Sequence, residues 1–328
     1  MKILVVRFSS IGDIVLTTPV VRVLAKAGYE VHFLTKKAYV QVLEGNPYIE
    51  QIHLLADDWS TMIQDLKRQH FNHVVDLHHN LRTARLKAQL GVSCSSFPKI
   101  NWQKWLAVHA STSFLPDLHI VDRYFKAVQP LSLENDGFGL EFYFPDDFSF
   151  STGEFLDSAG VKNDQYLAWV IGGAHQTKCY PEDKIAEVLS LIKSNIVLVG
   201  GPDEQEMGER LQNRFAKVVN SCGLLSIAES AMLIKDALKV LTNDTGMMHI
   251  AAAFKKQMVV FWGNTIPEFG MYPYLPDSKE NYINLQIEGL RCRPCSKIGF
   301  EQCPKKHFRC MRDLSPKRVV EALNSLPL

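Results

Sequence analysis

The sequence of 328 residues lacks a long apolar run, a large net charge and a paired set of cysteines. No stretch approaches the roughly 20 apolar residues that a membrane-spanning helix needs. With 36 lysines and arginines against 35 carboxylates, the net charge of +1 disfavours a dedicated nucleic-acid-binding protein. Seven cysteines do not form a disulfide framework in so long a chain. The apolar start is cut by Arg7, and no signal cleavage site follows it. We therefore expect a cytoplasmic protein.

Short apolar runs alternate with helix-length segments along the chain. Hydrophobic residues make up 46%, enough for two cores at this length. The alternation predicts an α/β protein with doubly wound parallel sheets, in two series separated by an irregular region around residues 130–162. The runs that predict strands are residues 3–6, 31–34, 52–55, 73–77, 167–171, 196–199, 238–241 and 258–262.

The loop after the first expected strand, Arg7-Phe8-Ser9-Ser10-Ile11-Gly12-Asp13, is the first candidate site. Ligands of open α/β sheets bind beyond the carboxyl ends of the strands. The loop has no G-x-G-x-x-G, which argues against a nicotinamide dehydrogenase. Gly12 permits a close backbone approach. Asp13 is either a general base or an ordinary helix cap.

Two acidic loops follow strands of the second series. Asp203 and Glu204 come after Gly200-Gly201 and either accept hydrogen bonds from ribose hydroxyls or cap the next helix. Asp244-Thr245-Gly246 opens a helix whose free amides suit a phosphate. His249 lies one turn further along that helix. The alternative is a capped helix with a buried histidine.

Two basic residues also follow expected strands. Lys178 comes shortly after Gly172-Gly173 and is either directed at a diphosphate or a surface lysine. Arg82 follows Asp76-Leu77 and is a candidate clamp for an anionic acceptor. The aromatic segment 101–116 favours packing into a core, with a bilayer surface as the alternative.

Four cysteines gather near the C-terminus: Cys292, Cys295, Cys303 and Cys310. Their thiolates have the number and ligand type of a structural zinc site. The second pair is more widely spaced than is usual for such sites. Disulfides and free buried thiols are therefore the alternatives.

These motifs occur in one order over nearly the whole chain. The set is Arg7-Phe8-Ser9-Ser10-Ile11-Gly12-Asp13 with Thr17-Thr18-Pro19, Asp76-Leu77 with Arg82, Gly200-Gly201-Pro202-Asp203-Glu204, Asn243-Asp244-Thr245-Gly246 with His249, and Cys292-Arg293-Pro294-Cys295. In this combination the sequence resembles glycosyltransferase family 9, the ADP-heptose:lipopolysaccharide heptosyltransferases.

The resemblance implies a GT-B fold, with two Rossmann-like domains facing each other across a cleft. Residues 1–160 would bind the acceptor, residues 161–315 the nucleotide sugar, and residues 316–328 would form a helix that packs on the first domain. It also implies an inverting transfer of heptose from ADP-L-glycero-D-manno-heptose to the lipopolysaccharide inner core. No cofactor would be required for catalysis, and the protein would contact the inner membrane peripherally.

The resemblance also assigns roles to residues. Asp13 would be the catalytic base and Arg82 an acceptor contact. Donor contacts would be Gly12, Lys178, Asp203 or Glu204, Asp244, Thr245, Gly246 and His249. The stretch before Lys178, Ala174-His175-Gln176-Thr177, lacks the paired hydroxyl residues of some heptosyltransferases, and Cys179-Tyr180 follows where a basic or polar residue and Trp are more usual. A transferase for another sugar or acceptor, and a non-catalytic nucleotide-sugar-binding paralogue, are therefore the alternatives.

Overall fold

The computed structural model describes residues 1–110, 114–161 and 165–327. Its contacts divide the chain into two compact units. Unit 1 consists of Met1–Ile100 and Leu118–Phe148, and unit 2 of Asn101–Asp117 and Ser149–Leu328. The division after Phe148 falls in the irregular region expected around residues 130–162, whose last residue lies outside the described part. Segment 101–117 belongs by its contacts to unit 2, although it precedes the last part of unit 1 in the chain.

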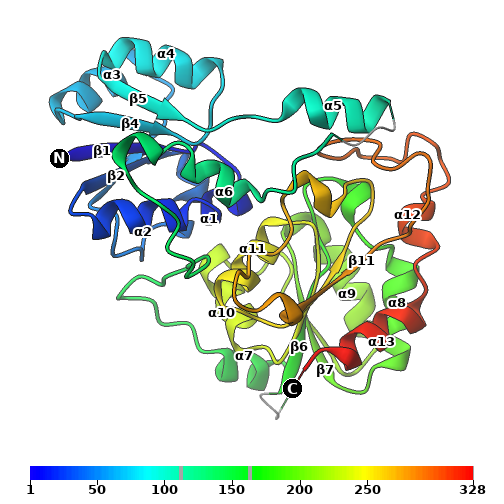
Figure 1. The fold of residues 1–328 in the computed structure, drawn as a ribbon. Helices are drawn as coiled ribbons and strands as arrows, with labels where there is room; N and C mark the ends of the chain where they lie inside the picture. The colour runs from blue at the N-terminus through cyan, green and yellow to red at the C-terminus, as the bar shows by residue number, and fades with distance from the viewer. Residues whose placement is uncertain (111–113, 162–164, 328) are drawn as a thin grey trace. The chain divides into compact units, whose positions relative to one another are not determined.

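Unit 1 is built on a parallel sheet with the strand order β3-β2-β1-β4-β5 (Figure 1). The central strands β1 and β2 are buried on both faces, as expected for a sheet covered by helices. The strands are β1 (Lys2–Val6), β2 (Glu30–Thr35), β3 (Gln51–Leu54), β4 (His73–Asp76) and β5 (Ser93–Ser96). The helices are α1 (Ile11–Val15), α2 (Thr18–Lys26), α3 (Trp59–Arg68), α4 (Leu81–Leu90) and α6 (Ile120–Phe125).

Unit 2 contains a second parallel sheet, with the order β11-β10-β9-β6-β7-β8. Its strands are β6 (Tyr166–Val170), β7 (Asn195–Val199), β8 (Val218–Asn220), β9 (Val240–Asn243), β10 (Met258–Phe261) and β11 (Tyr282–Leu285). Its helices are α5 (Asn101–His109), α7 (Thr152–Ser158), α8 (Glu182–Leu191), α9 (Gln205–Arg214), α10 (Ile227–Asp236), α11 (Gly246–Ala253), α12 (Arg309–Arg312) and α13 (Pro316–Ser325). The predicted α/β class with parallel sheets is confirmed.

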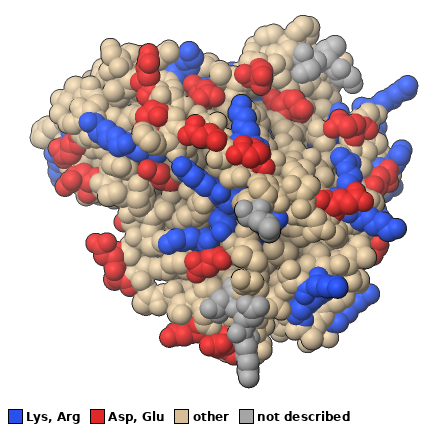
Figure 2. Space-filling view, turned by 60° about the horizontal axis from the view of Figure 1, so that its bottom comes forward, with Lys and Arg blue, Asp and Glu red and all other residues tan. Residues whose placement is uncertain are grey.

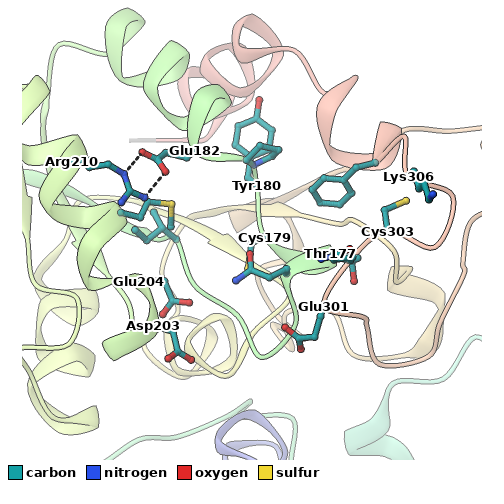
Figure 3. Close-up of a pocket in the computed structure, with 16 residues that line it drawn as sticks. Thr177, Cys179, Tyr180, Glu182, Asp203, Glu204, Arg210, Glu301, Cys303 and Lys306 are labelled. Carbon is teal, nitrogen blue, oxygen red and sulfur yellow. Dashed lines mark hydrogen bonds and ion pairs between the residues drawn. The ribbon is translucent and has the colours of Figure 1, made fainter.

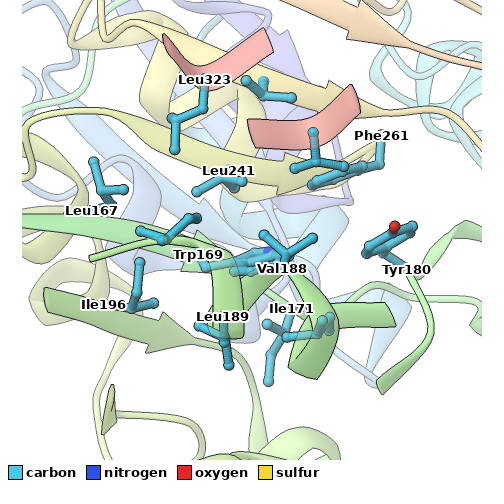
Figure 4. Packing of buried hydrophobic residues seen from close by; sticks show 14 of the residues in the cluster. Leu167, Trp169, Ile171, Tyr180, Val188, Leu189, Ile196, Leu241, Phe261 and Leu323 are labelled. Atoms are coloured by element: carbon cyan, nitrogen blue, oxygen red, sulfur yellow. The ribbon is translucent and has the colours of Figure 1, made fainter. Parts of the chain in front are cut away.

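The core of unit 2 lies between its sheet and the helices α8 and α13 (Figure 4). Trp169 and Phe261 stack with ring centroids 6.1 Å apart, and Tyr180 stacks on Phe261 at 4.8 Å. All three side chains are buried. Burial of such rings contributes on the order of 2–3 kcal/mol each. This core fixes the strand ends on which the unit's candidate site residues stand.

The C-terminal helix does not follow the expectation that residues 316–328 pack on the N-terminal domain. Helix α13 packs against α8 and β10 of unit 2 (Figure 1). Its apolar face, with Val319, Ala322 and Leu323, belongs to the unit 2 core. Because Val319 and Leu323 are spaced one helical turn apart, they present a single stripe to that core. Leu328 lies outside the described residues.

Acidic and basic side chains are interspersed over the face of the molecule in Figure 2, in keeping with the net charge near zero. Among the described residues, no helix has both the length and the apolar character needed to cross a bilayer. Within unit 1, the buried Arg22 pairs with Asp136 at 2.6 Å and with Glu141 at 2.8 Å. These pairs attach α2 to the segment that follows α6.

A histidine pair in unit 1 makes its stability depend on pH. His32 Nδ1 lies 2.8 Å from His53 Nε2, and the rings stack. Burial, with the charges of His32 and Lys2, lowers the pKa of His53 to about 4. An unfolded histidine titrates near ~6.5, so between that pH and about 4 the unfolded chain binds a proton that the folded chain does not.

We therefore expect the free energy of unfolding of unit 1 to be constant above pH ~6.5 and to fall as the pH drops towards 4. The measurement is denaturant unfolding at a series of pH values. His53→Gln should reduce the slope of the unfolding free energy against pH between about pH 4 and pH ~6.5. His109→Gln, on α5 of unit 2, serves as the control. The slope would persist in part, because burial also lowers the pKa of His78 to about 4. An unchanged slope in His53→Gln would contradict the assignment.

Candidate functional site

Both sheets reverse their strand order beside their first strand. In unit 1, β1 lies between β2 and β4, and in unit 2, β6 lies between β7 and β9. Parallel α/β sheets bind ligands at such reversals, beyond the carboxyl ends of the strands. The segments that follow β1 and β4 carry Asp13 and Arg82, and the segments that follow β6 and β9 carry Lys178 and Asp244. The sequence candidates therefore stand where the topology of each sheet favours a ligand.

Asp13 lies on the short helix α1 and is bound on both carboxylate oxygens. Its Oδ1 pairs with Arg7 Nη2 at 2.6 Å, and its Oδ2 accepts hydrogen bonds from the Ser10 amide at 3.2 Å and the Ser10 hydroxyl at 2.9 Å. Its side chain is 24% exposed. Burial alone would raise the pKa of Asp13, but Arg7 and Ser10 outweigh it and hold the pKa below its usual value. Asp13 thus has a helix-capping contact and is also an ionised carboxylate with access to solvent.

Arg7 belongs to the candidate site through its pair with Asp13, although the sequence alone gives it no role. Its guanidinium donates to the Ser9 carbonyl at 2.8 Å and to the Leu77 carbonyl at 2.5 Å, and it lies over the Tyr124 ring at 5.9 Å. These contacts orient the face that pairs with Asp13. The sequence does contain a signal for this pairing: Arg7 directly follows the apolar run 3–6. A cation next to a buried strand requires an anionic partner.

Arg82 lies in the first turn of α4 and is exposed. The preceding Asp76 is fully buried, pairs with Lys87 at 2.9 Å, and accepts hydrogen bonds from the amides of His78 and His79. Asp76 therefore stabilises the turn at His78 and His79, which is a structural role. Arg82 is left on the surface at the carboxyl end of β4.

In unit 2, Lys178 and Asp244 form an ion pair at 2.7 Å. Lys178 closes the 3₁₀ helix η3 (Gln176–Lys178), and its ammonium also donates to the Asp244 carbonyl at 3.4 Å. The Asp244 carboxylate accepts a further hydrogen bond from Thr265 Oγ1 at 2.8 Å. Both contacts are to Oδ2, so Asp244 holds Lys178 beside the start of α11. The expected contact of Asp244 with the donor stays a prediction.

Helix α11 begins beside this pair with an open N-terminus. Thr245 is its N-cap, and Thr245, Gly246 and Met247 are half-buried while the following turn is buried. The Thr245 hydroxyl is buried and has no hydrogen-bond partner among the described residues. Free amides and the positive end of the helix dipole suit an anion. His249 is 3% exposed and lies behind this opening.

Glu204 is a buried carboxylate at the carboxyl end of β7. It closes the 3₁₀ helix η4 (Pro202–Glu204), and its Oε2 accepts a hydrogen bond from the Gly201 amide at 2.8 Å. Burial, reinforced by the charge of Asp203, raises the pKa of Glu204. Asp203 itself is exposed. The two acidic residues that the sequence left as alternatives therefore differ sharply in environment.

Gly172 and Gly173 lie between these two groups of residues. A Cβ on Gly172 would come within 2.5 Å of the Glu204 carboxylate, and a Cβ on Gly173 would lie 3.4 Å from Thr245 Cγ2. The glycines therefore make room for Glu204 on one side and for the start of α11 on the other. The structure thus brings Glu204, Thr245 and Lys178 together around one strand end.

A pocket of about 590 Å³ adjoins this strand end (Figure 3). Its volume falls in the roughly 300–1,000 Å³ range of small-molecule sites. Asp203 and Glu204 lie together on one side, and Glu301, Cys303 and Lys306 on the other. Further lining residues are Ile171, Gln176, Thr177, Cys179, Tyr180, Pro181, Glu182, Met207, Arg210, Gln302 and Phe308.

Asn243 is a second residue that the sequence reasoning left without a role. Its side-chain amide donates to the carbonyls of Ile171 and Gly172, each at 3.0 Å, and its Oδ1 accepts a hydrogen bond from the Tyr180 amide at 3.2 Å. It is fully buried. Asn243 therefore fixes the end of β6 and the loop that carries Lys178.

The four C-terminal cysteines are free thiols. Cys310 is buried, and Cys292, Cys295 and Cys303 are partly buried. Cys292 Sγ lies 3.7 Å from His307 Nε2. Among the described residues, no group of three or more His, Cys, Asp or Glu side chains is arranged to hold a metal ion. The zinc hypothesis for these cysteines stays a prediction.

Two Rossmann-like units in one chain, with candidate residues at the strand-order reversal of each sheet, define the class of GT-B proteins. The chain belongs to glycosyltransferase family 9 (heptosyltransferase), whose family model matches residues 59–301. This confirms the resemblance on which the site assignments depend.

Curated relatives carry heptosyltransferase names. The chain is 31% identical over 147 residues to lipooligosaccharide heptosyltransferase 2 of Campylobacter jejuni, a match that covers 44% of each chain. It is 21% identical over 316 residues to lipopolysaccharide heptosyltransferase 1 of Escherichia coli, covering 88% of this chain and 98% of the relative. The match thus spans less than half the length of the first of these relatives.

Solved structures share the fold over nearly the full length. The family 9 glycosyltransferase from Veillonella parvula has a TM-score of 0.78 at 20% identity, covering 99% of this chain and 96% of its own. An E. coli heptosyltransferase solved with ADP has a TM-score of 0.68 at 19% identity and is covered completely. These likenesses confirm the GT-B fold that the resemblance implied.

Proposed function

We propose that this protein transfers heptose from ADP-L-glycero-D-manno-heptose to the inner core of lipopolysaccharide, at the cytoplasmic face of the inner membrane. The proposal is supported by membership of family 9 and by the names of the relatives. The observation that carries it is the convergence of Glu204, Thr245 and Lys178 around Gly172 and Gly173. A carboxylate, an open helix start and a cation at one strand end suit a ribose and a diphosphate.

On the donor side, Glu204 would accept hydrogen bonds from the ribose hydroxyls, and Asp203 would remain outside at the surface. The α- and β-phosphates would lie at the start of α11, on the amides of Gly246 and Met247 and on the Thr245 hydroxyl. Lys178 would turn from Asp244 towards the diphosphate. The negative charge that develops on the leaving ADP would thus meet an ammonium and a helix N-terminus.

On the acceptor side, Asp13 would remove the proton from the attacking sugar hydroxyl. A general base must be ionised and within hydrogen-bond reach of that proton. Arg7 keeps Asp13 ionised and fixes its orientation, while part of its carboxylate is open to solvent. Arg82 would bind a carboxylate or phosphate of the inner core. Attack on the side of the anomeric carbon opposite to the ADP inverts its configuration.

The experiment is a transfer assay with a panel of sugar nucleotides and a truncated core acceptor. We expect product with ADP-heptose, and inverted anomeric configuration in the product by NMR. If product forms only with another sugar nucleotide, that sugar nucleotide replaces ADP-heptose as the proposed donor. The test matters because the residues around Lys178, at Ala174-His175 and Cys179-Tyr180, differ from those usual in heptosyltransferases. Saturable binding without transfer to any acceptor would favour a non-catalytic binding protein.

We also propose that transfer needs no divalent metal. The Asp244 carboxylate beside the proposed diphosphate site is already bound by Lys178 and Thr265. The cation role that Mg²⁺ has in other transferases would fall to Lys178 and the α11 amides. Turnover should therefore stay unchanged in EDTA. A loss of turnover that added Mg²⁺ restores would contradict the proposal.

Metal analysis of the same purified protein tests the zinc hypothesis. A structural site made by the four cysteines would hold about one zinc per chain. Its loss in Cys292→Ser, with unchanged content in Cys94→Ser, would assign it to Cys292, Cys295, Cys303 and Cys310. A content far below one per chain would reject the site.

A further inference from the structure

Helix α5 carries two tryptophans that are exposed to solvent. Trp102 is 61% exposed and Trp105 is 57% exposed. Trp169 and Trp262 are buried, and Trp59 is half-buried with its indole bonded to Gln89. The expectation that the aromatics of this segment pack into a core is therefore wrong for Trp102 and Trp105. Large apolar surface that stays exposed commonly marks an interaction site.

The two indoles lie on one face of α5. Residues three apart in a helix are neighbours on its surface, and His109, one further turn along, stacks on Trp105 at 4.7 Å. The opposite side of the helix is attached to unit 2. Ala107 is its buried residue, and Lys104 lies 5.1 Å from the Phe269 ring. Thus α5 presents a fixed aromatic ridge, Trp102, Trp105 and His109.

The charged residues of α5 and of the sequence on either side of it are of one sign. Between Asp76 and Asp117 the sequence contains no Asp or Glu, but five lysines and arginines. Of these, Lys99 lies just before α5, and Lys104 lies within it, on the side opposite to the tryptophans. Tryptophan prefers the headgroup region of a bilayer, where its ring is in an apolar layer and its N–H reaches water. An exposed lysine next to the helix, such as Lys99, adds attraction to anionic lipids.

We propose that α5 lies in the headgroup region of an anionic phospholipid bilayer, with Trp102 and Trp105 inserted. This rests on the proposed function, since a lipid-linked acceptor confines the reaction to a membrane surface. The contact would be reversible, because a single short amphipathic helix binds a membrane surface far more weakly than a membrane-spanning one. The helix would hold unit 2 at the surface on which the acceptor is anchored.

The test is co-sedimentation of the full chain with phosphatidylcholine vesicles, with and without phosphatidylglycerol. Wild type should bind the anionic vesicles and show a blue shift of tryptophan emission with quenching by brominated lipid. Trp102→Ala/Trp105→Ala should lower the partition coefficient about 10-fold or more. The matched control is Leu191→Ala/Leu238→Ala, which removes two exposed apolar side chains elsewhere in unit 2. Unchanged ADP affinity shows that the variants are folded.

Absence of wild-type binding to anionic vesicles, or equal binding by the tryptophan variant, would overturn the proposal. So would a concentration-dependent self-association without lipid that the tryptophan variant abolishes, because the ridge would then be a protein interface. Transfer to a soluble truncated acceptor separates the two claims. Transfer without vesicle binding refutes only the membrane contact, while vesicle binding without transfer refutes the proposed activity.

Discussion

Asp13→Asn is expected to lower kcat about 1,000-fold while the Kd for ADP stays within about twofold of wild type. The amide preserves the size of the side chain and accepts a hydrogen bond from Ser10, but it cannot take up the acceptor proton. The proposed ribose and phosphate contacts Glu204, Thr245 and Lys178 belong to unit 2 and are untouched. The measurements are steady-state transfer and calorimetric ADP binding. Asp65→Asn, an exposed carboxylate on α3, is the control.

The pH profile separates a base from a structural carboxylate. In wild type the pKa of Asp13 lies below its usual value because Arg7 and Ser10 outweigh burial. Removing the guanidinium in Arg7→Met leaves burial dominant and raises that pKa. The acid limb of kcat/KM should therefore move to higher pH in Arg7→Met. Near-normal turnover in Asp13→Asn, or an acid limb that does not move, would remove Asp13 from the role of base.

The elements with a clear local signal were predictable. Continuous apolar runs marked the central strands: the expected runs 3–6 and 196–199 match β1 and β7 to within a residue. The strand Ser93–Ser96 was missed because an edge strand of serines and a cysteine has no apolar run. The packing of α13 on unit 2 was not predicted. Its apolar stripe shows that the helix covers a core, but does not show whether that core belongs to unit 1 or unit 2.

The candidate site was predictable in its residues and not in its pairings. Strand ends and glycines identified Asp13, Lys178 and Thr245, since chemistry-bearing residues in α/β proteins follow strands. That Arg7 pairs with Asp13, and Asp244 with Lys178, depends on strand order and register, which a single sequence does not contain. The choice between Asp203 and Glu204 likewise needed burial, which depends on the space that Gly172 leaves.

Lys178→Met is expected to weaken ADP binding about 30-fold, because a charge-assisted hydrogen bond worth about 2 kcal/mol is lost. Methionine keeps the length and apolar stem of the side chain, so the packing of η3 is retained. The measurement is calorimetric titration with ADP and, separately, with adenosine. Adenosine lacks the diphosphate and should bind wild type and Lys178→Met equally. Lys184→Met, a partly exposed lysine on α8 paired with Glu187, is the control.

Asp244→Asn tests whether Asp244 touches the phosphates or orients the lysine. Asparagine still accepts the hydrogen bond from Thr265, so the loop is held, but the negative charge is gone. If Asp244 only orients Lys178, the variant loses some orientation and also some repulsion of the diphosphate. ADP affinity should then change much less than in Lys178→Met, and the double variant should bind ADP like Lys178→Met alone. A loss in Asp244→Asn that adds in full to that of Lys178→Met would instead give Asp244 its own contact with the donor.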